Sequence, residues 1–62
     1  MDDKAVINDS YTVTLHQLFY VLFSSFAGAA GDASAEASAT AAFQSGVLLA
    51  RRVRDQALLI VA

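Results

Sequence analysis

The stretch from Leu15 to Phe26 holds most of the chain's large apolar side chains outside its two ends. Six of these side chains follow the spacing i, i+3, i+4, i+7, i+8, i+11, which places them on one face of an α-helix. A strand would divide the same side chains between its two sides. The pattern therefore predicts a helix whose apolar face must be buried. The six residues are Leu15, Leu18, Phe19, Leu22, Phe23 and Phe26.

The chain has little material with which to cover that face, because 62 residues form one small domain. Small domains usually gain stability from disulfides, metals or oligomerisation. The sequence has no cysteine and a single histidine, so it offers neither a disulfide nor a set of clustered metal ligands. Only 16% of the residues are charged, against roughly 25% in an average soluble domain. These features predict a domain that is stable only as an oligomer.

The first predicted helix covers residues 14–30 and follows an extended segment over residues 1–13. Large and β-branched residues alternate over residues 11–15, a pattern typical of extended chain. Thr14 and Gln17 match the capping box that often begins a helix. An alternative start at Asp9 or Ser10 lengthens this helix by about one turn.

Two glycines interrupt the helical pattern near the middle of the chain. Gly31 suits the position just after a helix, and Asp32 or Ser34 can cap a second helix with Glu36 in its first turn. The second helix is predicted over residues 33–61. We therefore predict an all-α fold, a two-helix hairpin, with one long bent helix as the alternative.

Small residues recur at every fourth position of the second helix, at Ala42, Gly46 and Ala50. A row of small side chains leaves a shallow groove on the helix surface, which lets a neighbouring helix approach closely. Packing the large side chains of the first helix into that groove still leaves apolar surface uncovered, which indicates association with further copies or a partner. The predicted interface comprises Leu15, Leu18, Phe19, Leu22, Phe23, Phe26, Ala42, Gly46, Ala50, Val53, Arg51 and Arg54.

Charge is distributed unevenly along the sequence. Residues 1–36 hold five acidic residues and one lysine, whereas residues 37–62 hold three arginines and Asp55. The two halves can attract each other between subunits or within one hairpin. Arg51 could instead pair with Asp55 one helical turn later. An acidic net charge of −2 argues against nucleic acid as a partner.

No motif in the sequence points to catalysis. It contains no G-x-S-x-G turn, phosphate-binding loop or dinucleotide fingerprint. His16 is the single histidine, and no serine or carboxylate is spaced to orient it. We predict a chain that is not an enzyme and that binds no cofactor, metal or small-molecule substrate.

The start, MDDK, is net acidic, whereas a secretory signal begins with a positively charged region, so the predicted location is the cytoplasm. Residues 10–31 contain no charged side chain when His16 is taken as neutral. A helix needs about 20 residues to cross a bilayer, so this segment is long enough. Seven polar residues dilute this segment. The alternative function is a small membrane-active or membrane-anchored protein, such as a holin-like pore-former, with residues 10–31 inserted.

Two alanine-rich stretches, AGAAGDAS over residues 27–34 and TAAFQSGV over residues 40–47, suggest a family. They resemble the small RebB-type proteins that make up bacterial R bodies, which pair an alanine- and asparagine-rich segment with an A-A-x-x-x-G-V stretch. This chain departs from that pattern in lacking the family's glutamine-rich middle and in its arginine cluster, Arg51, Arg52 and Arg54. The resemblance implies a subunit of a coiled proteinaceous ribbon. The predicted function is accordingly a self-assembling structural protein, whose partner is itself, in a homo-oligomer, filament or ribbon.

Overall fold

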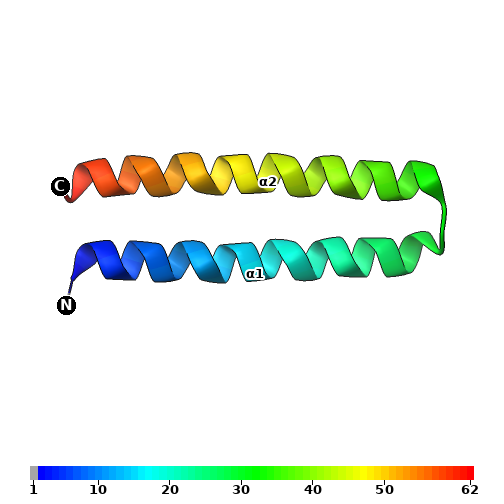
Figure 1. Ribbon diagram of the computed structural model, residues 1–62, viewed down its shortest axis with the longest axis horizontal. Coiled ribbons are helices and arrows are strands. Elements are labelled where there is room, and N and C mark those ends of the chain that lie inside the picture. Colours follow the sequence, from blue (N-terminus) through cyan, green and yellow to red (C-terminus); the bar gives the residue numbers. More distant parts are fainter. Residues whose placement is uncertain (1) are drawn as a thin grey trace.

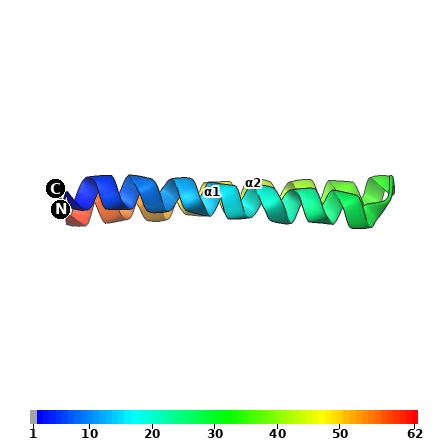
Figure 2. The same ribbon diagram turned by 90° about the horizontal axis from the view of Figure 1, so that it is seen from below.

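The computed structural model describes residues 2–62 and contains two helices, α1 (Asp3–Ala29) and α2 (Ala33–Ile60). The helices run antiparallel and side by side, so the two chain ends lie together at the end opposite the turn (Figure 1). The Cα atoms extend over 45 × 17 × 7 Å, which makes the hairpin a flat layer one helix thick (Figure 2). The predicted all-α hairpin is confirmed, and the alternative of one continuous helix is wrong.

The extended segment predicted before the first helix is wrong for residues 3–13, which belong to α1; Met1 lies outside the described residues. Asp2 caps α1, and its carboxylate accepts a hydrogen bond from the Lys4 N–H at 3.0 Å. Thr14 lies in the helix interior, where its hydroxyl donates to the Ser10 carbonyl at 3.0 Å. Its apparent capping box therefore does not begin a helix.

The longer α1 has a packing cause that outweighs local propensity. β-Branched residues such as Thr12 cost only a few tenths of a kcal/mol in a helix, and the Thr12 hydroxyl bonds the Asn8 carbonyl at 3.1 Å. Ile7 and Tyr11 are half-buried about two turns and one turn before Leu15, respectively. Their contact with α2 stabilises the additional turns, because tertiary packing supplies most of a helix's stability in a protein.

The turn between the helices uses two consecutive left-handed residues. Ala30 has φ +51° and Gly31 has φ +86°. Asp32 then caps α2, with its carboxylate accepting from the Ser34 N–H at 2.9 Å and the Ala35 N–H at 3.3 Å. The last residue of α1 is Ala29 and that of α2 is Ile60. Each lies one residue before the predicted end, at 30 and 61.

Ala30 is the strained position of this turn, because a side chain in the left-handed region costs about 1–2 kcal/mol. We expect Ala30→Gly to raise the free energy of unfolding by about 1 kcal/mol, since glycine adopts this conformation freely. Gly31→Ala should lower it by about 1–2 kcal/mol for the converse reason. Urea unfolding followed by circular dichroism at one fixed protein concentration tests both; equal effects of the two substitutions would contradict this account of the turn.

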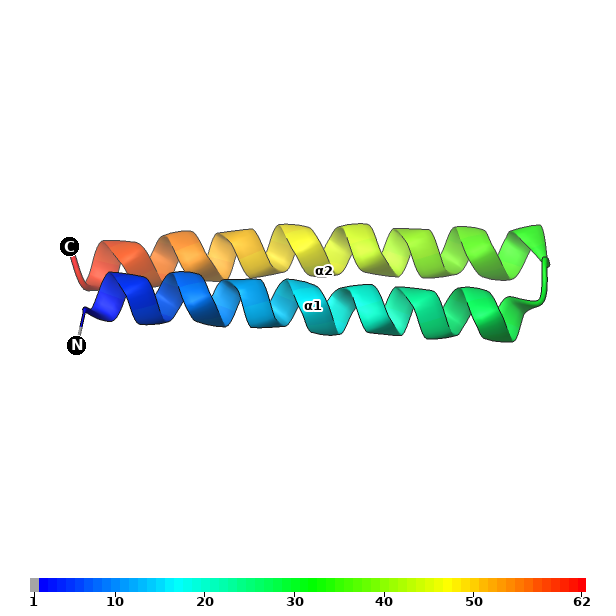
Figure 3. The same ribbon diagram turned by 60° about the horizontal axis from the view of Figure 1, so that its bottom comes forward.

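The two helices lie side by side along their length (Figure 3). They meet along a seam of half-buried residues that recur at intervals of three and four. Such spacing is typical of helices that pack side by side at a shallow angle. No side chain within residues 2–62 is fully buried, even at this seam. The seam includes Ile7, Tyr11, Leu15, Leu18 and Leu22 of α1 with Ala39, Phe43, Gly46, Ala50, Arg54 and Ala57 of α2.

Candidate interaction surfaces

One flat face of the hairpin carries a groove between α1 and α2, with a volume of about 460 Å³. Val6 on α1, and Leu49 and Val53 on α2, form its apolar walls. Leu49 is 54% exposed and Val53 is 59% exposed, so large apolar side chains border a hollow that the single chain leaves open. The full lining is Val6, Ile7, Ser10, Tyr11, Thr14, Leu18, Gly46, Leu49, Ala50, Val53, Arg54 and Ala57.

Close approach of the two helices forms part of that lining. A Cβ atom built on Gly46 would lie 2.7 Å from Cδ2 of Leu18 and 3.4 Å from its Cδ1. The Leu18 side chain thus occupies the space that any larger residue at position 46 would need. Gly46 is required for a contact within the chain, between Leu18 of α1 and the backbone of α2.

Three phenylalanines of α1, Phe19, Phe23 and Phe26, form a second exposed surface, which we call the Phe stripe. Phe19 is 55% exposed, Phe23 65% and Phe26 38%. Phe19 and Phe23 each follow a groove residue, Ser10 or Thr14, by nine positions, which is about 180° around a helix. Phe19 and Phe23 therefore lie on the face of the flat hairpin opposite the groove, and Phe26 lies at the edge of the Phe stripe nearest α2.

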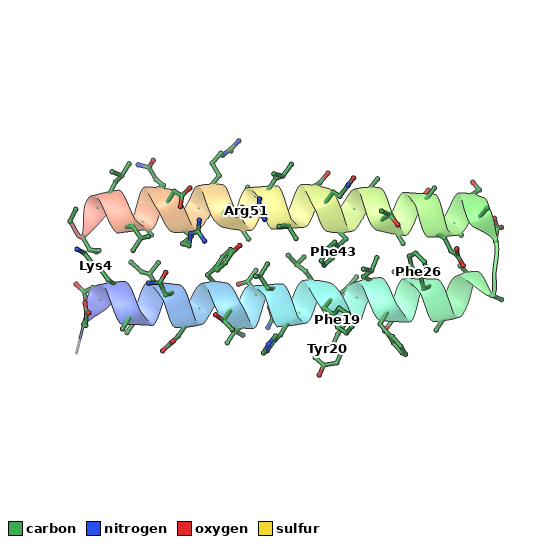
Figure 4. The ribbon with its side chains drawn as sticks, viewed as in Figure 1. Lys4, Phe19, Tyr20, Phe26, Phe43 and Arg51 are labelled. Atoms are coloured by element: carbon green, nitrogen blue, oxygen red, sulfur yellow. The ribbon has the colours of Figure 1, made fainter. Side chains whose placement is uncertain are left out.

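Tyr20 belongs to neither face. Its side chain points away from α2 at the outer edge of the hairpin, next to the labelled Phe19 (Figure 4). The Phe19 and Tyr20 rings pack edge to face, with centroids 6.0 Å apart. Tyr20 is 68% exposed, and this position offers a matched aromatic control for substitutions in the Phe stripe.

The six apolar residues predicted to form one buried face of α1 are divided in the structure. Leu15, Leu18 and Leu22 lie half-buried in the seam, whereas Phe19 and Phe23 are exposed. The six positions span an arc of roughly 140° around the helix, which is wider than one neighbouring helix covers. Phe19 and Phe23 lie on the part of the arc that α2 does not reach, whereas Phe26, at 38% exposed, points toward α2 (Figure 4).

The residues predicted on α2 are divided in the same way. Gly46 and Ala50 lie in the seam, while Ala42 and Val53 are exposed, and Val53 lines the groove. Sequence reasoning missed Ile7 and Tyr11, because the residues before Thr14 were assigned to extended chain. The spacing of four between Ile7, Tyr11 and Leu15 is the signal that would have placed them on the seam.

The arginine cluster of α2, Arg51, Arg52 and Arg54, contacts α1 through Arg54. Its guanidinium carbon lies 4.4 Å from the centroid of the Tyr11 ring, and its Nε and Nη2 donate to Oδ1 of Asp55 at 3.0 and 2.9 Å. Asp55 therefore pairs with Arg54, and the alternative pairing with Arg51 is not formed. Arg51 and Arg52 are exposed.

Arg54 links the two helices through Tyr11, so we expect Arg54→Ala to lower the free energy of unfolding by about 1 kcal/mol, the usual size of a partly exposed cation–π contact. Arg52→Ala removes the same charge from an exposed position and should change it by less than about 0.5 kcal/mol. Thermal unfolding by circular dichroism compares the two variants. Equal losses would show that charge, and not the Tyr11 contact, determines the effect.

The described residues form neither a cluster of metal ligands nor a helix able to span a membrane. Within residues 2–62, no three His, Cys, Asp or Glu side chains gather closely enough to hold a metal ion. Neither α1 nor α2, as described, combines the length and apolar character needed to cross a bilayer. Comparison with protein-family models, curated proteins and solved structures finds no match to this chain. The groove and the Phe stripe are the surfaces from which a function can be argued.

Proposed function

We propose that this chain is a non-enzymatic structural protein that assembles with copies of itself, each hairpin covering exposed apolar faces of its neighbours. One observation carries the proposal: residues 2–62 contain no fully buried side chain, while large apolar residues remain exposed on both helices. Contiguous apolar surface of this kind on a small domain marks an interaction site. A second copy supplies flat apolar faces of the same dimensions.

The dimensions of the hairpin suit such an assembly. A flat face of 45 × 17 Å offers roughly 800 Å² to each partner, the size of a standard protein interface. Stacking on both faces would convert the half-buried seam into the interior of a multilayer bundle. The hairpin alone has only one interhelical contact to oppose the conformational entropy lost on folding.

Charge supports contact between copies as well. Glu36 and Asp32 lie at the turn, whereas Arg51 lies fifteen residues beyond Glu36 along α2, a separation of roughly 22 Å. These groups are too far apart to pair within one hairpin, so pairing between them requires a second copy. A net charge of −2 per chain gives only modest repulsion between copies.

The form of the assembly follows from how the faces repeat. Contacts that close on themselves give a small oligomer, whereas contacts that do not close give a filament. The resemblance of residues 27–34 and 40–47 to RebB-type proteins implies the open form, a ribbon.

Size-exclusion chromatography with light scattering, on protein purified without detergent, tests the proposal. We expect a mass of two or more chains, and electron microscopy of the same sample distinguishes a defined particle from a filament. A monomer at every concentration would contradict self-assembly. Recovery of the protein only in detergent would favour a membrane-active protein instead.

A further inference from the structure

We propose that neighbouring copies pack through unlike faces, with the Phe stripe of one hairpin seated in the groove of the next. This inference rests on the proposed function and specifies which surfaces meet. The groove is an open apolar hollow of about 460 Å³, and the Phe stripe is a row of exposed aromatic rings. Rings of this size bury about 150–250 Å² each when they enter a pocket.

Like faces leave the hollow unfilled. If two groove faces met, neither would bring phenylalanines to the other, since Phe19 and Phe23 lie on the far side of α1. If two Phe stripes met, both grooves would remain open to solvent. Contact between unlike faces fills the groove and covers the rings in one step, and close packing of apolar surface is the more stable arrangement.

The lengths of the two surfaces match. Along α1 the groove extends from Val6 to Leu18, roughly 18 Å at 1.5 Å per residue. The Phe stripe extends from Phe19 to Phe26, roughly 10 Å on the same basis. The rings can therefore lie within the groove along its axis.

Their positions along the hairpin also determine the direction of the second copy. The centre of the groove lies roughly 6 Å from the middle of α1 toward the chain ends, and the centre of the Phe stripe lies roughly 10 Å from it toward the turn. A second copy pointing in the opposite direction brings the two centres within about 4 Å while both 45 Å faces overlap fully. A copy pointing in the same direction would have to slide by roughly 16 Å and would lose overlap.

Each hairpin in this arrangement uses both faces at once. A copy that receives rings in its groove still presents its own Phe stripe on the opposite face. An interface between unlike surfaces that does not return to its starting point generates an open assembly. Growth therefore proceeds by stacking flat hairpins in alternating directions, with one free groove at one end and one free Phe stripe at the other.

A mixing experiment distinguishes this arrangement from pairing of like faces. Val53→Glu places a charge in the groove, and Phe23→Glu places one in the Phe stripe; both positions are exposed in the hairpin. The Val53→Glu chain keeps an unaltered Phe stripe, and the Phe23→Glu chain keeps an unaltered groove. Contact through the altered surface is strongly disfavoured, because it would bury an unpaired carboxylate. Each variant alone should remain monomeric at concentrations where the unaltered chain assembles, with at least about a hundredfold weaker association.

Mixing the two variants in equal amounts should give a heterodimer of one copy each, and no larger species, by light scattering and native mass spectrometry. The expected contact joins the Phe stripe of the Val53→Glu chain to the groove of the Phe23→Glu chain. If either hairpin loses helicity when monomeric, mixing should restore it, as measured by circular dichroism. Tyr20→Glu, which adds the same charge at the outer edge, should assemble like the unaltered chain.

A mixture that stays monomeric, or either variant assembling alone as the unaltered chain does, would overturn the unlike-face arrangement. Both results leave self-assembly of the unaltered chain in place, so they differ from failure of the proposed function, in which the unaltered chain itself is monomeric.

Discussion

Replacing Gly46 with leucine is expected to lower the free energy of unfolding of the hairpin by about 2 kcal/mol, a large share of the stability of so small a domain. Even a Cβ at this position would lie 2.7 Å from Cδ2 of Leu18, so alanine already requires the Leu18 side chain to move. The further carbons of leucine would have to displace Leu18 from the seam or extend into the groove, which Gly46 also lines. Leucine is the better helix former by about 1 kcal/mol, but overpacking outweighs that gain. Urea unfolding at fixed protein concentration measures the difference.

Gly28→Leu provides the matched control, since it makes the same chemical change on the other helix. No atom lies within 4 Å of a Cβ built at Gly28. The gain in helix propensity is therefore unopposed there, and the variant should be more stable by up to about 1 kcal/mol. Changes of opposite sign in the free energy of unfolding at positions 46 and 28 support the contact between Leu18 and Gly46. Changes of the same sign would show that helix propensity, and not this contact, determines the stability of the hairpin.

Removing two rings of the Phe stripe is expected to weaken self-association by about a hundredfold. Phe19 and Phe23 are more than half exposed, so covering the exposed part of each contributes roughly 1–1.5 kcal/mol. At concentrations high enough for the double variant Phe19→Ser and Phe23→Ser to assemble, it should have the helical content of the unaltered chain, because neither ring lies in the seam. Sedimentation equilibrium measures the association constant.

Tyr20→Ser is the control for this pair, because it removes an aromatic ring of similar exposure from the outer edge of the hairpin. It should leave the association constant within about threefold of that of the unaltered chain. Equal weakening by Tyr20→Ser would indicate that any exposed ring promotes association. Lower helical content in the assembled double variant than in the assembled unaltered chain would show that the rings stabilise the hairpin itself.

The turn and the helix around Leu15–Phe26 could be predicted because each has a local cause. The apolar spacing of that stretch fits only a helix. Gly31 marks the end of one helix and Asp32 caps the next, and both preferences act without contacts from the rest of the fold. The first helical turns could not be predicted from local propensity. Thr12 and Thr14 favour extended chain in isolation, and contact with α2 overrides that preference.

The division of the apolar face could not be predicted, because it depends on how α1 is rotated against α2. The close approach of Leu18 to Gly46 sets that rotation. Periodicity shows which residues share a broad face, but it does not show how much of that face a single neighbour covers. The Phe stripe and the groove therefore became visible only once both helices were placed together.

The most direct test of the central claim is to follow assembly and helical content together as the unaltered, detergent-free chain is diluted over about a hundredfold range of concentration. Sedimentation velocity reports the mass, and circular dichroism on the same samples reports the helix. We predict that the mass falls with dilution and that the melting temperature falls with it, because association stabilises the folded hairpin. A mass of one chain at every concentration, with a melting temperature independent of concentration, would contradict self-assembly of the hairpin.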